Sequence, residues 1–205
     1  MLDALVHSAD GSLDTQSVLS EDRLIRVLRR LVDPDEFLAG GGIRSLSAAY
    51  RDGAVIRLDG SDLPIAYVPG ESHSPMFGGN SNWRGPIWFP VNVLLADALR
   101  TYAAGMASDV QVEFPHGSGE YRPVVAVADE IDQRLTGLFR MGPDWRRPSD
   151  PRDIPTDPLW QAHPTFSEYF HGDTGAGLGA SHQTGWTALV AHLICKPWRR
   201  HTGAL

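Results

Sequence analysis

The chain has 205 residues, of which 42% are hydrophobic and 21% charged, so its composition suits one globular domain and excludes a disordered or collagen-like chain. Its formal net charge is −7 and Lys196 is its only lysine, so no basic stripe indicates a nucleic-acid partner. The single cysteine, Cys195, excludes an intrachain disulfide and a cysteine-based metal cluster, and it fits a reducing compartment.

The first predicted elements are a helix and a β-hairpin. The helix begins after Ser20, a suitable N-cap, and ends before Pro34. Its apolar residues follow the helical period: Leu24, Val27, Leu28 and Leu31. Two apolar runs, 54–58 and 63–67, flank an Asp-Gly pair and predict a short hairpin, which Pro64 weakens. We expect this hairpin to decorate a helical domain.

Three further helices are predicted from the same periodicity. The clearest spans residues 88–106, with an apolar stripe at Val91, Leu94, Leu95, Ala98, Leu99 and Tyr102. Another begins near Pro123, with its stripe at Val124, Val127, Ala128, Ile131, Leu135 and Leu138. The last is marked by Trp186, Leu189, Val190, Leu193 and Ile194, and Pro197 breaks it. Residues 143–164 are expected to form a loop. The predicted fold class is therefore all-α, with irregular glycine-rich loops.

Two stretches rich in glycine and aromatic residues, 77–88 and 166–186, precede predicted helices. Sugar rings have an apolar face and a rim of hydroxyls, so sugar sites combine flat aromatic rings with amide, guanidinium and carboxylate groups. These two stretches supply that mixture: Asn80, Asn82, Trp83, Arg84, Trp88, His182, Gln183 and Trp186. The alternative is that the tryptophans belong to the core and the glycines to turns.

Glu168 is a candidate catalytic carboxylate because it lies among aromatic residues. Phe166, Tyr169 and Phe170 would lower the local dielectric and make an unused charge costly. The alternative is a solvated loop carboxylate, as most glutamates are.

Four stretches of the sequence resemble the C-terminal part of glycoside hydrolase family 63 and of its bacterial relatives that act on glucosylglycerate and mannosylglycerate. Two of them are short, Gly42-Ile-Arg-Ser-Leu-Ser47 and Pro69-Gly-Glu-Ser72. The other two are long and specific, "FGGNSNWRGPIWFPVN" at 77–92 and "EYFHGDTGAGLGASHQTGWTAL" at 168–189. The ending is also similar, more loosely, to that of trehalases.

The resemblance implies an (α/α)6 barrel that hydrolyses a glycosidic bond with inversion, with Glu168 matching the family's general base. In such a reaction a second carboxyl group protonates the departing oxygen. Trp83, Arg84, Gly85 and Trp88 would line the sugar subsite, and Ser181, His182 or Gln183 could orient Glu168. The further expected pocket residues are Asn82, Glu71, Tyr169, His171 and Trp186. Arg44 belongs either to the pocket or to a structural ion pair.

The resemblance implies that the family's general acid, an aspartate, lies in an earlier part of the barrel, so we expect this chain to begin too late to contain it. The early aspartates of this sequence lack an aromatic, glycine-rich context. Only four or five helices are predicted, whereas the barrel needs twelve. Residues 1–205 are therefore expected to be the C-terminal portion of a larger catalytic domain. Its exposed apolar helix faces would favour self-association or binding to the missing N-terminal part.

Three functions remain open at this stage. The chain is the base-bearing part of a glycosidase, a carbohydrate-binding or regulatory remnant, or a scaffold in which the motif residues only pack. The expected ligand is a small sugar or glycoside, with the choice between glucose and mannose left open. No cofactor or metal is expected, because the glycine run 172–179 lacks the lysine of a phosphate loop and the histidines lack zinc-site spacing. Because no apolar run reaches about 18 residues, we expect a cytoplasmic protein without a membrane partner.

Overall fold

The computed structural model describes residues 20–73, 82–105, 110–151, 153, 157–182, 186 and 188–195, and the backbone of two short strands before them. The described helices are α1 (Glu21–Leu31), α2 (Phe89–Ala104), α3 (Val124–Gly137), α4 (Pro158–Ala162) and α6 (Leu189–Cys195). The paired strands are β1 (Val6–His7) with β2 (Leu13–Asp14), β3 (Leu38–Ala39) with β4 (Gly42–Ile43), β5 (Ala54–Leu58) with β6 (Ser61–Ile65), β7 (Gln111–Glu113) with β8 (Tyr121–Pro123), and β9 (Ser167–Phe170) with β10 (Gly177–Ser181).

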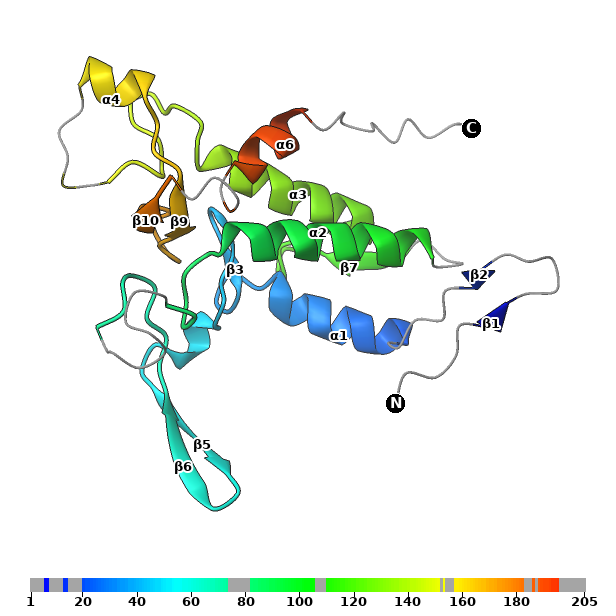
Figure 1. Cartoon of the computed structure of the whole chain (residues 1–205). Helices are drawn as coiled ribbons and strands as arrows, with labels where there is room; N and C mark the ends of the chain where they lie inside the picture. The colour runs from blue at the N-terminus through cyan, green and yellow to red at the C-terminus, as the bar shows by residue number, and fades with distance from the viewer. Residues whose placement is uncertain are drawn as a thin grey trace, which may run out of the picture.

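Helix α2 packs against α3, α6 packs against α3, and α1 contacts β7; α1, α2 and α3 run in alternating directions (Figure 1). Their facing sides form one apolar cluster, which also includes strands β3, β4 and β7. The hairpin β5–β6 projects away from this cluster, whereas β9–β10 lies at the end of the helices where α2 begins (Figure 1). The core therefore positions one end of the helical layer next to the strands that carry the second motif.

The predicted apolar stripe of α3 is confirmed. All six predicted residues are buried: Val124, Val127, Ala128, Ile131, Leu135 and Leu138. The helix begins directly after Pro123, whose φ of −63° and extended ψ precede the first turn. The period of 3.6 residues places all six side chains on the side that faces α2 and α6.

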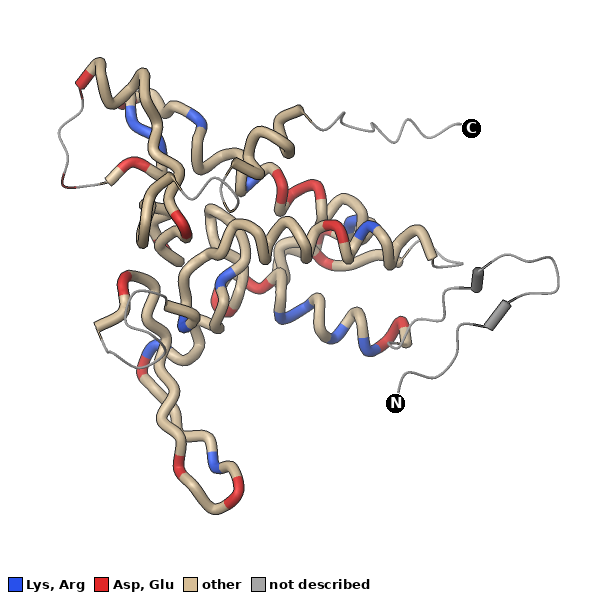
Figure 2. The backbone as a smooth tube through the Cα atoms, viewed as in Figure 1, with Lys and Arg blue, Asp and Glu red and all other residues tan. Residues whose placement is uncertain are grey.

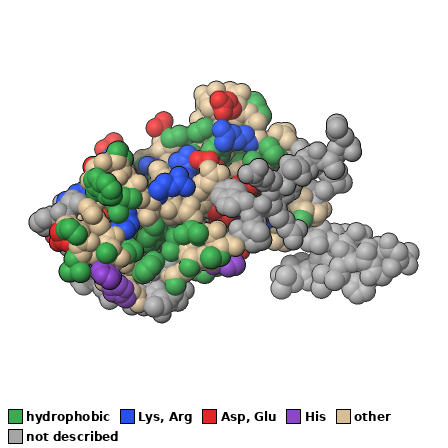
Figure 3. Space-filling model, turned by 90° about the horizontal axis from the view of Figure 1, so that it is seen from above, with side chains coloured by type: hydrophobic (Ala, Val, Ile, Leu, Met, Phe, Trp, Pro, Cys, Tyr) green, Lys and Arg blue, Asp and Glu red, His purple; other side chains and the backbone are tan. Residues whose placement is uncertain are grey.

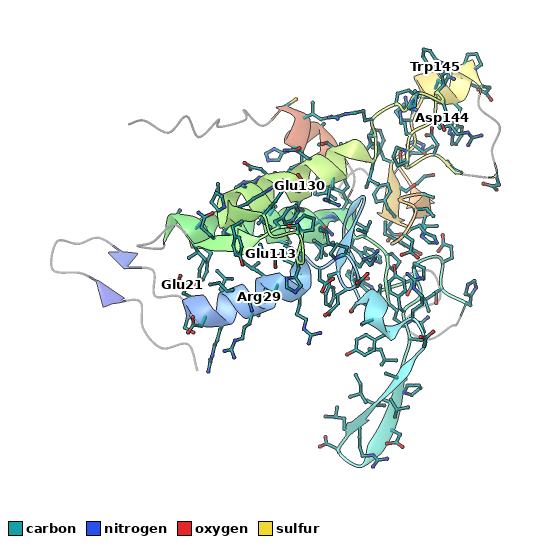
Figure 4. The ribbon with its side chains drawn as sticks, turned by 180° about the vertical axis from the view of Figure 1, so that it is seen from behind. Glu21, Arg29, Glu113, Glu130, Asp144 and Trp145 are labelled. Atoms are coloured by element: carbon teal, nitrogen blue, oxygen red, sulfur yellow. The ribbon has the colours of Figure 1, made fainter. Side chains whose placement is uncertain are left out.

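Helix α1 also forms where it was predicted, with Ser20 in extended geometry before its first residue. Acidic Glu21 lies at its start and basic Arg29 in its last turn, as Figure 4 shows. These charges complement the helix dipole, which is positive at the N-terminus and negative at the C-terminus. Leu24 and Leu28 are buried, but Val27 is 54% exposed, so only part of the predicted stripe faces the core.

The predicted stripe of α2 is confirmed in part: Leu99 is buried, and Leu95 and Tyr102 pack partly buried against the core. The helix buries Phe89, Asn92, Val93, Ala96 and Leu99. The predicted core residues Val91 and Leu94 are instead 46% and 69% exposed, and Ala98 is exposed. Apolar side chains occur all round this helix, so periodicity alone does not select the buried face. Figure 3 shows apolar side chains at the surface on the face seen from above.

The all-α prediction is confirmed in part: helices form the core as expected, but several short antiparallel strand pairs accompany them besides the one predicted hairpin. The hairpin β5–β6 was predicted, and it pairs Val55 with Pro64 in regular register. The sequence did not predict the other strand pairs, because their strands have only two to five residues and show no alternation of apolar and polar side chains. The predicted loop 143–164 also contains α4, where the Asp157 side chain accepts a hydrogen bond from the Trp160 amide at 2.8 Å.

Asn92 joins α2 to the hairpin β3–β4 through a buried side chain. Its Oδ1 accepts a hydrogen bond from the Ile43 amide at 2.7 Å, and its Nδ2 donates to the Ile43 carbonyl at 3.0 Å. The same Nδ2 also lies 3.0 Å from the Trp88 carbonyl. Gly42, next to Ile43, leaves no space for a β-carbon, which would lie 2.9 Å from Asn92 Oδ1. One amide thus fixes the helix start against the hairpin.

We expect Asn92→Ala to lower the free energy of unfolding by about 3 kcal/mol, because it leaves the buried amide and carbonyl of Ile43 without their partner. The measurement is chemical denaturation of both proteins. The matched control is Leu94→Ala on the exposed side of the same helix, which should change stability by less than about 0.5 kcal/mol. An equal loss in both variants would contradict this account of α2.

Candidate functional site

The two sequence motifs are joined by a reciprocal pair of backbone hydrogen bonds. The Ile87 amide donates to the Phe170 carbonyl at 2.8 Å, and the Phe170 amide donates to the Ile87 carbonyl at 2.9 Å. Both side chains are fully buried. This antiparallel bridge places the start of α2 beside strand β9, although 83 residues separate the two (170 − 87). Trp88 follows Ile87 and Tyr169 precedes Phe170, so the bridge brings Trp88 and Tyr169 into contact.

Four aromatic rings gather at this junction. The Trp83 and Trp88 rings stack with centroids 3.9 Å apart and planes 3° apart. Trp88 also stacks on Tyr169, with centroids at 4.6 Å, and meets Trp186 edge to face at 5.6 Å. Trp88 is 2% exposed and Trp83 48% exposed. Trp88 therefore supports the stack, and Trp83 presents an aromatic surface to solvent.

Asn82 organises the irregular segment that carries Trp83. Its Nδ2 donates to the carbonyls of Val68 and Gly70, at 2.8 and 2.7 Å. Its Oδ1 accepts from the Arg84 amide at 3.0 Å, and its carbonyl accepts from Trp88 Nε1 at 2.9 Å. Asn82 is 1% exposed, so it satisfies the backbone of two loops from inside the protein.

Gly85 lies tightly against the segment that contains Tyr67 and Val68. Its φ is +148°, a backbone conformation that side chains disfavour. A β-carbon here would lie 2.7 Å from a Tyr67 ring carbon and 2.9 Å from the Val68 carbonyl oxygen. The neighbouring Arg84 is half-buried, and its carbonyl accepts a hydrogen bond from the Val68 amide at 2.6 Å.

Glu168 lies on strand β9, opposite an irregularity in its partner strand. Tyr169 pairs with Leu178 and Ser167 with Ser181, so Gly179 and Ala180 together face the single residue Glu168. This is a β-bulge, and Gly179 adopts the left-handed φ of +67° that such bulges favour. The amide of Ala180 donates to Glu168 Oε2 over a long distance of 3.4 Å. The sequence had suggested Ser181, His182 or Gln183 for this contact.

The side chain of Glu71, which belongs to a loop far away in the sequence, contacts the same bulge. Its Oε1 accepts a hydrogen bond from the Gly179 amide at 2.8 Å, and its Oε2 accepts from the Tyr169 hydroxyl at 2.5 Å. Burial and the neighbouring Glu71 carboxylate raise the pKa of Tyr169 well above its ordinary value. Tyr169 therefore stays a neutral donor at physiological pH.

Arg44 has a structural role at the edge of this site. Its guanidinium donates to the carbonyls of Pro34, Glu36 and Leu38 at 2.9 to 3.0 Å. It also lies 3.5 Å from Asp173. Of the two sequence alternatives for Arg44, the structure thus supports the ion pair.

Asp173 lies in the turn between β9 and β10, where it contacts Arg51 and Tyr67 as well as Arg44. It accepts hydrogen bonds from both nitrogens of Arg51 at 3.2 Å and from the Tyr67 hydroxyl at 2.8 Å. Although burial alone would raise the pKa of Asp173, the hydrogen bonds from Arg51 and Tyr67 outweigh it and hold that pKa below its ordinary value. Burial, together with this bond, raises the pKa of Tyr67 to about 12.

The remaining predicted residues are spread around the junction. His171 caps the turn, since its Nδ1 accepts from the amides of Asp173 and Thr174 at 3.1 and 3.3 Å. Burial lowers the pKa of His171, which favours the neutral ring that can accept these bonds. His182 is exposed at the end of β10. Gln183 lies outside the described residues.

Other features lie away from these residues. A hollow of about 540 Å³ opens between the β3–β4 turn, the end of α3 and the turn of β9–β10, and it is lined by none of the predicted site residues. Figure 2 shows charges of both signs spread over the described elements. Within the described ranges, no group of three acidic, histidine or cysteine side chains could hold a metal ion, and no helix is long and apolar enough to cross a membrane.

Comparison with known proteins gives three matches. The model of the mannosylglycerate hydrolase MGH1-like glycoside hydrolase domain matches residues 15–187. An uncharacterized protein of Saccharomyces cerevisiae is 45% identical over 183 residues, which cover 87% of this chain and 17% of the yeast protein. The mannosyl-oligosaccharide glucosidase of the same yeast is 28% identical over 120 residues, which cover 58% of this chain and 11% of that enzyme. The chain thus spans less than a fifth of either relative, and its resemblance to family 63 is confirmed.

The raised pKa of Tyr67 predicts a loss of stability at alkaline pH. Between about pH 10, where tyrosine ionises in an unfolded chain, and about pH 12, the folded protein keeps a proton that the unfolded chain releases. The free energy of unfolding should therefore fall through this window, by up to about 1.4 kcal/mol per pH unit for this one group.

We expect Tyr67→Phe to show a shallower fall, which denaturation at a series of pH values from 9 to about 12 would measure. Tyr169 should retain its own contribution in this variant. The control is Tyr121→Phe, which alters a side chain that is 65% exposed and should keep the wild-type slope. Parallel curves for the wild type and Tyr67→Phe would contradict the assignment.

Proposed function

The chain belongs to the mannosylglycerate hydrolase MGH1-like glycoside hydrolase family, and on that premise we propose that it carries the general base and one wall of the sugar site of an inverting glycosidase. The single observation that carries the proposal is the position of Glu168. This carboxylate lies on β9, opposite the bulge in β10. A β-carbon on Gly179 would lie 2.9 Å from Glu168 Oε2 and 2.6 Å from a ring carbon of Tyr169, which stacks on Trp88, so the carboxylate adjoins the aromatic group. A carboxylate beside stacked aromatic rings is what a glycosidase needs to act on a bound sugar.

The proposed mechanism assigns Glu168 the activation of water. Its carboxylate accepts a proton from a water molecule as that water attacks the anomeric carbon, on the face opposite the departing oxygen. The Ala180 amide, at 3.4 Å, helps to orient the carboxylate. Trp83 would hold the apolar face of the sugar, and Arg84 its hydroxyls. Trp88 would act indirectly, because it is only 2% exposed and supports the Trp83 ring.

The proton donor for the departing oxygen is proposed to come from another segment of an (α/α)6 barrel. Helices α2, α3 and α6 would then form part of the barrel wall. The alternating directions of α1, α2 and α3 (Figure 1) and the exposed apolar residues Val91 and Leu94 on α2 support this arrangement. Such a surface suits further helices of the same barrel or a second copy of the chain.

The proposed substrate class is an α-glucoside or α-mannoside, such as glucosylglycerate, mannosylglycerate or an oligosaccharide. The matching family model is described by a mannosylglycerate hydrolase, and one relative is a mannosyl-oligosaccharide glucosidase. Both names refer to sugars, and stacked aromatic rings such as those of Trp83 and Trp88 are suited to holding a sugar unit.

Glu168→Gln should lower the hydrolysis of α-glucosyl fluoride or α-mannosyl fluoride by at least about 100-fold, because an amide cannot accept the proton from water. Fluoride departs with little help from a general acid, so the assay tests the base without its acid partner. The matched control is Glu120→Gln, whose side chain is 68% exposed on the β7–β8 turn, and it should keep the wild-type rate. Sugar binding without turnover in the wild type would favour a carbohydrate-binding remnant.

Trp83→Ala should weaken binding of the same sugars about tenfold, because it removes the exposed aromatic ring. Calorimetry or a ligand-dependent shift in Tm measures the change. Trp88→Ala is the comparison, and it should instead lower the free energy of unfolding by about 3 kcal/mol, because Trp88 is buried. A Trp83→Ala protein with unchanged sugar affinity would rule out Trp83 as the sugar platform.

A further inference from the structure

The bulge in β10 leaves two consecutive backbone amides outside the strand pairing. Gly179 and Ala180 stand opposite one residue, so their amides cannot both pair with β9. Each amide donates to a carboxylate instead: Gly179 to Glu71 Oε1 at 2.8 Å, and Ala180 to Glu168 Oε2 at 3.4 Å. Adjacent amides thus link two carboxylates that are 97 residues apart in the chain (168 − 71).

Glu71 holds the bulge from two sides. Besides the hydrogen bond from the Gly179 amide, it accepts one from the Tyr169 hydroxyl at 2.5 Å. Tyr169 is the neighbour of Glu168 on β9 and is fully buried. Both strands of the hairpin are therefore fixed to the same carboxylate, one through a backbone amide and the other through a buried ring. Both Glu71 oxygens act as acceptors, so this carboxylate is arranged to fix protein groups.

The bulge leaves no space for a side chain at position 179. A β-carbon on Gly179 would lie 2.6 Å from a Tyr169 ring carbon and 2.9 Å from Glu168 Oε2. The left-handed φ of Gly179 is set by the same turn of the backbone that points its amide at Glu71. A small movement of Gly179 would therefore move the Ala180 amide relative to Glu168.

We infer that Glu71 is a positioning residue that acts through the Gly179–Ala180 bulge to hold the carboxylate of Glu168. The consequence for turnover rests on the proposed function of Glu168 as the base, whereas the structural coupling does not. A base must be held within about 0.5 Å of its productive position, so loosening this contact should lower kcat more than it weakens sugar binding.

The structural coupling is tested by NMR of the backbone amides. In Glu71→Ala, the resonances of both Gly179 and Ala180 should shift. In Glu168→Ala, the Ala180 resonance should shift more than the Gly179 resonance, because only Ala180 loses its hydrogen-bond acceptor. Glu120→Ala is the matched control and should leave both unchanged. If the Ala180 resonance is unmoved in a folded Glu71→Ala protein, the inference is overturned, whatever the activity.

The catalytic consequence is tested with the sugar fluoride assay. Glu71→Ala should lower kcat at least about tenfold with KM changed less than about threefold. Glu71→Gln keeps an oxygen for the Gly179 amide, so it should recover much of this loss. Tyr169→Phe removes only the hydroxyl and should have a smaller effect than Glu71→Ala.

The outcomes separate the two proposals. Unchanged kcat in Glu71→Ala, with an active wild type, would overturn the positioning role and leave the base assignment of Glu168 intact. No hydrolysis by the wild type, together with coupled amide shifts, would remove the base assignment and support the coupling. Because Glu71→Gln preserves hydrogen-bonding groups, it also guards against a loss of kcat caused by unfolding of the alanine variant.

Discussion

The reciprocal hydrogen bonds between Ile87 and Phe170 are the contact on which the site depends. Two backbone groups that would otherwise be buried without partners satisfy each other, and both residues are fully buried. The bridge sets the register between the start of α2 and strand β9. Because neighbouring residues in the two segments then face each other, Trp88 stacks on Tyr169 and the aromatic group forms. The helical core anchors one side of the bridge and the bulged hairpin the other.

Buried asparagines fix the irregular segments that surround this bridge. Glycine-rich loops have few side chains with which to bury apolar area, and their backbone groups need hydrogen-bond partners. Asn82 supplies partners to the loop around Val68 and Gly70, and Asn92 supplies them to Ile43. Each amide has both a donor and an acceptor, so one side chain satisfies an amide and a carbonyl together. Polar side chains therefore hold these loops in place where apolar packing could not.

The carboxylates near the hairpin have different partners, and these partners indicate different roles. Asp173 is surrounded by Arg51, Arg44 and the Tyr67 hydroxyl, and it stabilises the turn. Glu71 accepts one hydrogen bond from a backbone amide of β10 and one from a hydroxyl of β9, and thus joins these two strands. Glu168 accepts a long hydrogen bond from the Ala180 amide, its one hydrogen bond within the described part of the chain, and is half-buried. Of the three, Glu168 is the least committed to structure, which is consistent with the role proposed for it in activating water.

Several features can be read from the amino-acid sequence alone: the family, the helices α1 and α3 with most of their buried faces, the hairpin β5–β6, and the two motifs that meet at the site. These features depend on local periodicity, on turn residues, or on specific motif residues, all of which can be recognised in the sequence. Only the tertiary structure decided which face of α2 is buried, because that helix is apolar all round. It also decided the β9–β10 pairing, the bulge opposite Glu168 and the contact with Glu71, because they arise from backbone hydrogen bonds between residues far apart in sequence, which no local pattern encodes.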